Sequence, residues 1–248
     1  MSKKLEISRP IEGLVLLTIN GAGKNGVAGA ALAQELSAAC EEINFDTSVR
    51  VVIITGSEGK AFCTGLPGRG KDSIYSLSIP VAALECPVIA AINGDAIGIG
   101  FELALACDIR IASANARFSL PYIEKGLIPS DGATQRLPRL IGQARAIEMM
   151  LTGEAIWADE ACRIGLISKV TADQKLMPCV LEMGKEMAGK AALSLKYCKE
   201  AVLKGMDMTL DQGLRLEGDL YFLLHTTEDR TEGITAFKEK RKPHFKGK

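Results

Sequence analysis

The stretch that decides the fold runs from Cys86 to Ala112 and reads CPVIAAINGDAIGIGFELALACDIRIA. Residues 87–92 are a short apolar run rich in β-branched side chains, which predicts a buried strand. An Asn-Gly-Asp turn follows at residues 93–95, and residues 98–106 are an apolar segment that we predict to be a helix. Residues 109–112 resume the strand pattern. A strand, a helix and a second strand in this order are typical of a parallel sheet.

The same order of elements occurs earlier in the chain. Residues 13–20 and 49–55 are apolar runs closed by polar or glycine turns, and they predict two further buried strands. Between them, residues 28–43 carry apolar side chains at helical spacing. We therefore predict an α/β fold that contains a parallel sheet.

The second half of the chain has a different pattern. We expect no strand after Gln143, and we predict a loop at residues 126–138 because glycine and proline punctuate them. The predicted helices lie near residues 143–151, 158–163, 178–189, 193–204, 209–224 and 227–240. The second half is therefore expected to be almost entirely helical.

Composition places the chain among soluble globular proteins and excludes several partners. Of its 248 residues, 47% are hydrophobic and 24% are charged, which is the ordinary range for a chain with a substantial core. Thirty Lys and Arg balance thirty Asp and Glu, so no net field attracts nucleic acid. The apolar runs end well before the roughly 20 residues that a membrane helix needs. We expect neither a nucleic acid nor a membrane as partner.

The cysteines and histidines predict no disulfide framework and no metal site. The seven cysteines are scattered without a C-x-x-C pair, so we interpret them as reduced thiols. The two histidines, His225 and His244, have no clustered cysteines or carboxylates at ligand spacing. Residues 1–6 show no secretory signal pattern. We therefore expect a cytoplasmic protein.

Two glycine-rich loops partly match nucleotide-binding motifs, but each lacks one residue that its motif requires. The first covers residues 65–72, where Asp72 stands in place of the Ser or Thr of a phosphate-binding loop. The second covers residues 94–100, and Leu103 occupies the place of the third glycine of a dinucleotide fingerprint. Both loops leave backbone N–H groups unpaired, and two such groups aimed at one carbonyl oxygen would stabilise an oxyanion.

Glu102 lies one helical turn beyond Gly98, which brings its carboxylate over the same end of the predicted helix. Two interpretations of this spacing stay open. Glu102 either complements the helix dipole or acts as an acid/base beside the oxyanion.

Seven motifs then occur in one order along the chain. They are GKAFCTG at 59–65, CPVIAAING at 86–94, GIGFELALACDIR at 98–110, ARF at 116–118, TQRLP at 134–138, LTG at 151–153 and AFKEKRK at 236–242. Together they resemble the crotonase family, the enoyl-CoA hydratase and isomerase superfamily, from about Gly13 to the C-terminus. The resemblance implies a ββα spiral core over residues 1–190. It also implies a C-terminal all-helical trimerisation region over residues 191–248, in a homotrimer or a dimer of trimers.

The resemblance implies an acyl-CoA thioester as substrate and an enolate-like intermediate. The backbone N–H groups of Leu66 and Ile99 would hold its oxyanion, although Ile99 departs from the usual glycine. Glu102 matches the first catalytic glutamate of the hydratases, whereas Tyr122 occupies the place of the second. Asp131 lies next to the position of an acid in some isomerase branches, so it either supplies a second acid/base or is a turn residue of its loop.

Further residues match family positions that contact substrate or CoA. Within the core these are Lys24, Ala61, Gly65 and Gly98. In the C-terminal region, Lys240 matches a lysine that reaches the CoA phosphates from a neighbouring subunit, and Tyr221 matches an aromatic residue that shares this contact. A lysine beside several phosphate charges would form charge-assisted hydrogen bonds.

Three functions remain open at this point. Enoyl-CoA hydratase is the leading one, and a double-bond isomerase that uses a single base is the second. The third is a catalytically silent acyl-CoA binder of the same fold. An RNA-binding role is disfavoured because residues 28–43 contain no Lys or Arg. We expect no cofactor beyond the CoA of the substrate, and no metal.

Overall fold

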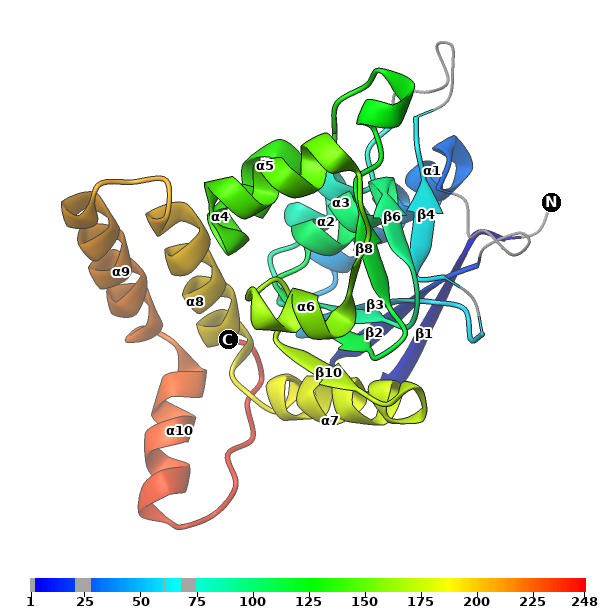
Figure 1. Ribbon diagram of the computed structural model, residues 1–248. Helices are drawn as coiled ribbons and strands as arrows, with labels where there is room; N and C mark the ends of the chain where they lie inside the picture. The colour runs from blue at the N-terminus through cyan, green and yellow to red at the C-terminus, as the bar shows by residue number, and fades with distance from the viewer. Residues whose placement is uncertain (1–2, 21–27, 60, 68–74) are drawn as a thin grey trace.

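Two β-sheets share one hydrophobic core in the computed structural model, which describes residues 3–20, 28–59, 61–67 and 75–248 (Figure 1). The strands are β1 (Leu5–Ile11), β2 (Leu14–Ile19), β3 (Val51–Gly56), β4 (Cys63–Gly65), β5 (Val88–Ile92), β6 (Ala96–Gly98), β7 (Ile109–Ser113), β8 (Arg117–Ser119), β9 (Ile156–Trp157) and β10 (Lys169–Thr171). The helices are α1 (Ala30–Phe45), α2 (Ser78–Ala82), α3 (Ile99–Ala106), α4 (Ala133–Ile141), α5 (Gln143–Thr152), α6 (Ala158–Arg163), α7 (Leu176–Ala188), α8 (Ala192–Gly205), α9 (Leu210–Leu224) and α10 (Glu228–Lys238), with short 3-10 helices at Ile123–Lys125 and Asp173–Lys175.

The chain alternates between the two sheets. One sheet has the order β1-β2-β3-β5-β7-β10 and is parallel except for the β1–β2 pair. The other has the order β4-β6-β8-β9 and is parallel except for the β8–β9 pair. A strand in the first sheet is followed by a strand in the second and then by a helix, as in β3-β4-α2 and β5-β6-α3. This alternation is the ββα spiral, and the α/β fold class is confirmed.

Both faces of the larger sheet are covered. Every residue of β3 and β5 is buried. Alternate residues of these strands join two hydrophobic clusters, one on the side of α1 and α3 and the other beneath α7. A strand that is buried on both faces reads as a continuous apolar run, which is why its sequence pattern was easy to recognise.

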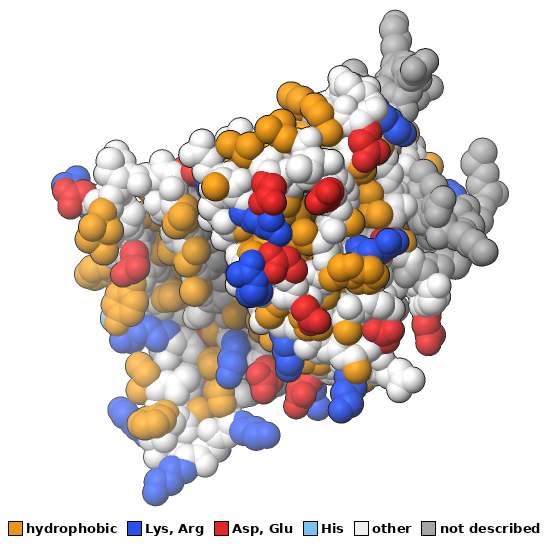
Figure 2. Space-filling view, viewed as in Figure 1, with side chains coloured by type: hydrophobic (Ala, Val, Ile, Leu, Met, Phe, Trp, Pro, Cys, Tyr) orange, Lys and Arg blue, Asp and Glu red, His pale blue; other side chains and the backbone are white. Residues whose placement is uncertain are grey.

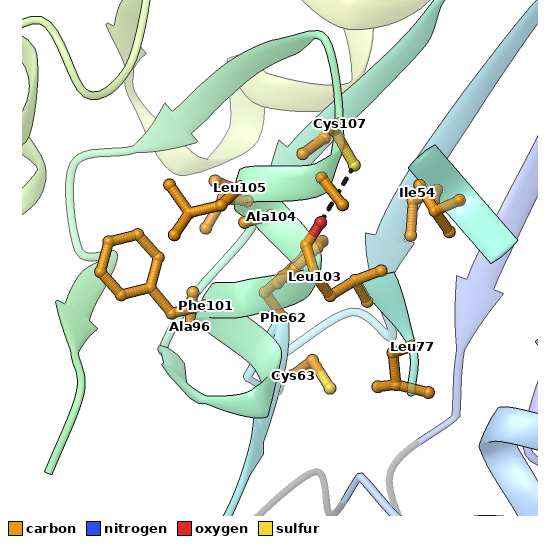
Figure 3. Packing of buried hydrophobic residues seen from close by; sticks show 14 of the residues in the cluster. Ile54, Phe62, Cys63, Leu77, Ala96, Phe101, Leu103, Ala104, Leu105 and Cys107 are labelled. Atoms are coloured by element: carbon orange, nitrogen blue, oxygen red, sulfur yellow. Dashed lines mark hydrogen bonds between the residues drawn. The ribbon is translucent and has the colours of Figure 1, made fainter. Parts of the chain in front are cut away.

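Helix α3 runs through the larger cluster and is buried along its whole length. Figure 3 shows its apolar side chains among those of neighbouring elements, with Phe62 and Cys63 at the start of β4 and Leu77 before α2. The Phe101 ring meets the edge of Phe118 on β8 at a centroid distance of 5.5 Å. Among these apolar neighbours, α3 carries a single carboxylate, that of Glu102.

The last three helices stand away from the rest of the chain (Figure 1). No residue of α8 is buried, and Leu220 is the buried residue of α9. The Lys199 ammonium on α8 forms a 2.8 Å ion pair with Asp108 at the start of β7, and both side chains are largely buried. We call α8, α9 and α10 the C-terminal layer. The boundary placed at residue 190 stays a prediction.

Three details of the sequence-based prediction were wrong. Strands β9 and β10 follow Gln143, where we expected none, because runs of two or three residues are too short to show alternation. Helix α4 begins at Ala133 inside the predicted loop, since burial of Ala133 and Leu137 one turn apart outweighs the cost of Pro138 within the helix. Strand β1 was missed because it is a mostly exposed edge strand that contains Pro10.

Candidate functional site

The candidate site lies where three parallel strands of the smaller sheet end. Gly65 at the end of β4 pairs with Gly98 at the end of β6, and Ile97 on β6 pairs with Ser119 at the end of β8. The carboxyl ends of these strands therefore lie along one edge. Ligands of α/β proteins commonly bind beyond such an edge.

The backbones of β4 and β6 approach unusually closely at this edge. A Cβ on Gly98 would lie 2.0 Å from the Gly65 carbonyl oxygen, and Gly98 has φ +61°. Only glycine fits both conditions without strain. Leu66 and Ile99 directly follow this pair of glycines, one after each strand, so their amides lie at the same edge.

The amide of Ile99 is available because Ile99 is the first residue of α3, where a helix leaves its N–H groups without an intrahelical partner. Its β-branched side chain is buried in the core cluster, and Leu66 packs against that cluster from a half-buried position. Substituting the usual glycine by Ile99 therefore leaves the amide in place. This arrangement suits an oxyanion hole at Leu66 and Ile99, a role that stays a prediction.

Glu102 projects from the first turn of α3 and its side chain is fully buried. Its Oε1 accepts hydrogen bonds from the backbone N–H groups of Asp131 at 2.7 Å and Ala133 at 3.1 Å. Its Oε2 accepts a hydrogen bond from the Tyr122 hydroxyl. A carboxylate has about four acceptor positions, so one lone pair of Oε2 is left for a water or a reacting group.

Burial raises the pKa of the Glu102 carboxyl above its ordinary value. The hydrogen bonds from Tyr122, Ala133 and Asp131 oppose this rise, and the nearby Asp131 charge adds to it. A carboxylic acid whose pKa is raised towards neutrality is suited to taking up a proton and giving it back.

Tyr122 is buried just beyond β8. Burial and the adjacent Glu102 carboxylate raise the pKa of its phenol well above the ordinary value. Tyr122 therefore stays protonated and donates to Glu102, and it is not a base at neutral pH. Sequence reasoning placed Tyr122 in the site, and the structure brings it to Glu102.

Asp131 lies next to Glu102, but its carboxylate faces another element. One oxygen accepts from the Ser76 hydroxyl, and the other accepts from the N–H groups of Leu77 at 3.0 Å and Ser78 at 2.9 Å. These contacts fix the start of α2. The carboxylate thus bonds to residues 76–78 rather than within its own loop. Sequence reasoning missed Ser76, because no local pattern signals a contact across 55 residues.

The other candidate residues fall into three groups. Gly65 and Gly98 lie at the carboxyl ends of β4 and β6, with Gly98 buried and Gly65 half-buried, whereas the half-buried Ala61 lies before the start of β4, next to Gly56. Tyr221 on α9 and Lys240 just after α10 are exposed on the C-terminal layer, away from Glu102 within one chain (Figure 1). Lys24 lies outside the described residues.

In the described ranges, His, Cys, Asp and Glu side chains form no group of three or more that could hold a metal ion. No helix within those ranges is long and apolar enough to cross a membrane.

The pH dependence of stability tests the burial of Glu102. Because the folded protein has the raised pKa, it binds the Glu102 proton more tightly than the unfolded chain does. The free energy of unfolding therefore falls as pH rises from the ordinary glutamate pKa through the raised one. Glu102→Gln has no carboxyl group to titrate at this position. Its thermal midpoint, relative to that of the wild type, should therefore rise between acidic and neutral pH. Circular dichroism melts at several pH values measure the difference, and a constant difference would contradict the prediction.

The sequence and the fold both match proteins of one known family. The family model described as enoyl-CoA hydratase/isomerase matches residues 11–248. The chain is 39% identical to a crotonyl-CoA hydratase of Syntrophomonas wolfei, over 85% of this chain and 86% of that protein. It is 38% identical to a 2,3-dehydroadipyl-CoA hydratase of Escherichia coli, over 95% and 96%. The crystal structure of an enoyl-CoA hydratase from Bacillus anthracis superposes with a TM-score of 0.95 at 36% identity, covering 99% of this chain and all of that one. The chain therefore belongs to the enoyl-CoA hydratase/isomerase family.

Proposed function

We propose that the protein is an enoyl-CoA hydratase that adds water across the C2=C3 bond of a 2-enoyl-CoA thioester. The observation that carries this proposal is the buried, ionisable Glu102 carboxylate one helical turn from the paired ends of β4 and β6. Family membership and the relatives named as hydratases support it.

The thioester oxygen would bind between the amides of Leu66 and Ile99. Polarising this oxygen withdraws electrons from C3 and stabilises the enolate that forms when water attacks there. Each backbone donor of this kind is worth about 10² to 10³ in rate. The donors are held by the strand pairing, so they need no rearrangement as the charge develops.

Glu102 would act as both base and acid. Its Oε2 takes a proton from water as the water oxygen bonds to C3, and the C2=C3 electrons move into the thioester enolate. Glu102 then returns a proton to C2 as the enolate collapses, so one water is added and Glu102 ends ionised. Tyr122 stays protonated throughout and orients Oε2 through its hydrogen bond.

A double-bond isomerase is the second candidate, and one observation favours it. The Tyr122 phenol is kept protonated, and both oxygens of the Asp131 carboxylate face residues 76–78, which leaves Glu102 to transfer protons. A single carboxylate can remove a proton from C2 of a 3-enoyl thioester and return it to C4 without water. A silent acyl-CoA binder would catalyse neither reaction.

The proposal includes no cofactor beyond the CoA of the substrate, because adding water changes no net oxidation state. We also propose a reducing compartment such as the cytoplasm. All seven cysteines are free thiols in the structure, which suits such a compartment.

We further propose a homotrimer, alone or as a dimer of trimers. Apolar side chains are exposed along α8 and α9 of the C-terminal layer (Figure 2). They include Val202, Leu203, Met206, Leu210, Leu214 and Phe222. A different apolar patch on α4 and α5 exposes Leu140, Ile147 and Leu151. If the C-terminal patch of one subunit packs on the α4–α5 patch of the next, the contact is between unlike surfaces. Contacts of this kind close into a ring, whereas a two-fold dimer pairs like surfaces.

In such a ring, the C-terminal layer of one chain reaches its neighbour. This placement would bring Lys240 and Tyr221 to the CoA portion of the neighbour's substrate, although they lie away from Glu102 in their own chain. Lys240 would pair with a CoA phosphate, and Tyr221 would offer a flat apolar ring.

Turnover assays with variants at Glu102 and Tyr122 test the chemistry. Glu102→Gln should lower kcat on crotonyl-CoA by about 10² to 10⁴, the usual worth of a positioned acid/base. Tyr122→Phe should keep more activity. In the wild type the hydrogen bond from Tyr122 lowers the pKa of Glu102, so its removal should raise that pKa and move the acid limb of the pH–rate profile to higher pH.

Mass analysis of the product separates the candidate functions. A gain of one water identifies the hydratase, and an unchanged mass with a shifted double bond on a 3-enoyl-CoA identifies the isomerase. Acyl-CoA binding without turnover of either substrate identifies the silent binder. Full activity in Glu102→Gln would exclude both enzyme mechanisms.

Light scattering tests the assembly. The wild type should have three or six times the 26.5 kDa chain mass. Leu214→Glu on α9 and Leu151→Glu on α5 should each yield monomers, because each buries a charge in one of the two patches. Since each variant keeps the other patch intact, an equimolar mixture should form a heterodimer. No association in the mixture would contradict the proposed pairing of unlike patches.

Substitution of Lys240 tests CoA recognition. Lys240→Ala should raise KM for a CoA thioester by about tenfold at low ionic strength, the worth of one charge-assisted hydrogen bond. It should leave kcat nearly unchanged, because the contact is the same in the ground and transition states. Salt should reduce the difference. Lys246→Ala is the matched control, another exposed lysine of the same tail, and an equal effect in both variants would assign the change to net charge alone.

A further inference from the structure

Three polar groups of Asp131 are all engaged, each by a different part of the molecule. Its carboxylate accepts from the Ser76 hydroxyl and the first amides of α2. Its carbonyl oxygen accepts from Arg136 Nη1 on α4 at 3.0 Å. Its N–H donates to Glu102 Oε1 at 2.7 Å, which is shorter than the parallel contact from Ala133. The residue therefore joins α2, α4 and the Glu102 carboxylate.

We propose that Asp131 is a positioning residue that holds Glu102 by fixing the direction of its own backbone N–H. This inference rests on the proposed function, in which Glu102 transfers the protons. It replaces the alternative in which Asp131 itself supplies a second acid/base.

The geometry explains why such an anchor is needed. Gly132 follows Asp131, has φ +105° and precedes the first turn of α4. A glycine in this region lets the chain rotate at little energetic cost, so the neighbouring peptide needs contacts outside the loop to fix it. The contacts to residues 76–78 are buried and supply that constraint.

The orientation of the carboxylate opposes a direct role in proton transfer. Both of its oxygens bond to residues 76–78, and only the backbone N–H of Asp131 contacts Glu102. Asp131 therefore acts on Glu102 through its main chain, while its carboxylate is an acceptor for the segment at the start of α2.

The charges around Glu102 make the proposal measurable. The Asp131 charge raises the pKa of Glu102, whereas the Tyr122 hydrogen bond lowers it. Of the elements packed against α3, β4 carries Cys63, whose thiol pKa burial raises to about 12, and α4 carries Arg136 and Arg139. Within the described residues, α2 and β6 carry no ionisable side chain. Tyr75, whose pKa burial raises, stays neutral beside Asp131.

The test is Asp131→Asn, which keeps the shape but removes the charge and one acceptor oxygen. We expect kcat to fall about tenfold from misplacement of Glu102, with KM changed by less than about twofold. We also expect the acid limb of kcat/KM to move to lower pH, opposite to the shift in Tyr122→Phe. Asp131→Glu keeps the charge, so the acid limb of its kcat/KM profile should stay near that of the wild type while its kcat falls.

Asp229→Asn is the matched control. The Asp229 carboxylate is also buried and also accepts backbone N–H groups, those of Lys246 at 2.6 Å and Gly247 at 2.9 Å. It lies on α10, so the variant should lose stability without any movement of the acid limb. If Asp131→Asn behaves like this control, with lower stability but unchanged kcat, its role is structural only and the proposal is overturned.

Two other outcomes are decisive. A loss of about 10² to 10⁴ in kcat together with disappearance of a pH limb would make Asp131 a second acid/base and overturn the proposal. Should Asp131→Asn fail to fold, Ser76→Ala removes one anchor from the same carboxylate and should lower kcat severalfold at constant KM; unchanged kcat would overturn the proposal.

A readout besides activity separates this inference from the proposed function. Carbon-13 labelling of glutamate side chains allows the Glu102 carboxyl to be titrated by NMR, with Glu102→Gln assigning its signal. In Ser76→Ala the Asp131 charge stays, so a weakened N–H contact from Asp131 should move the Glu102 titration to higher pH whether or not the protein hydrates enoyl-CoA. An unmoved titration overturns the positioning role, whereas absence of turnover in the wild type overturns the proposed function alone.

Discussion

The close approach of β4 and β6 is the constraint on which the site depends. With Gly98 next to the Gly65 carbonyl, the two backbones have no room for a side chain between them. Gly100 repeats the condition, because a Cβ there would lie 1.8 Å from the Cys63 carbonyl oxygen. The strand pairing therefore sets where α3 begins, and α3 in turn sets where Glu102 lies. The Ile99 amide and the Glu102 carboxylate are therefore placed by the same contact.

The buried carboxylate of Glu102 is stabilised by a small set of donors rather than by a countercharge. Two backbone amides at the start of α4 and one phenol surround it. Fixed dipoles of this kind stabilise the ionised carboxylate. A bound cation, in contrast, would neutralise its charge permanently. Such a group can change its charge during a reaction while the surrounding chain keeps its conformation. The same arrangement costs stability at neutral pH, which is a common trade between stability and activity.

Sequence reasoning succeeded where the physical signal is local. The strands β3 and β5 are continuous apolar runs, and the position of Glu102 one turn beyond Gly98 follows from helical geometry. It failed where the signal is tertiary. The partners of the Asp131 carboxylate lie more than fifty residues away, and β9 and β10 exist because neighbouring strands are there to pair with them. The resemblance located Tyr122 in the site, but its protonated state follows only from its burial beside Glu102.

The sparse packing of the C-terminal layer has a consequence for how the chain folds. Helices α8 to α10 bury few side chains within one chain, and their polar links to the core include the Lys199–Asp108 and Lys196–Glu85 ion pairs. Elements with so little burial contribute little to the free energy of unfolding of an isolated subunit. In the proposed homotrimer their stability would then depend on mass action, because a neighbouring subunit would cover them. Dilution of that assembly should accordingly loosen these helices first and leave the spiral core folded, which gives two transitions with different concentration dependence.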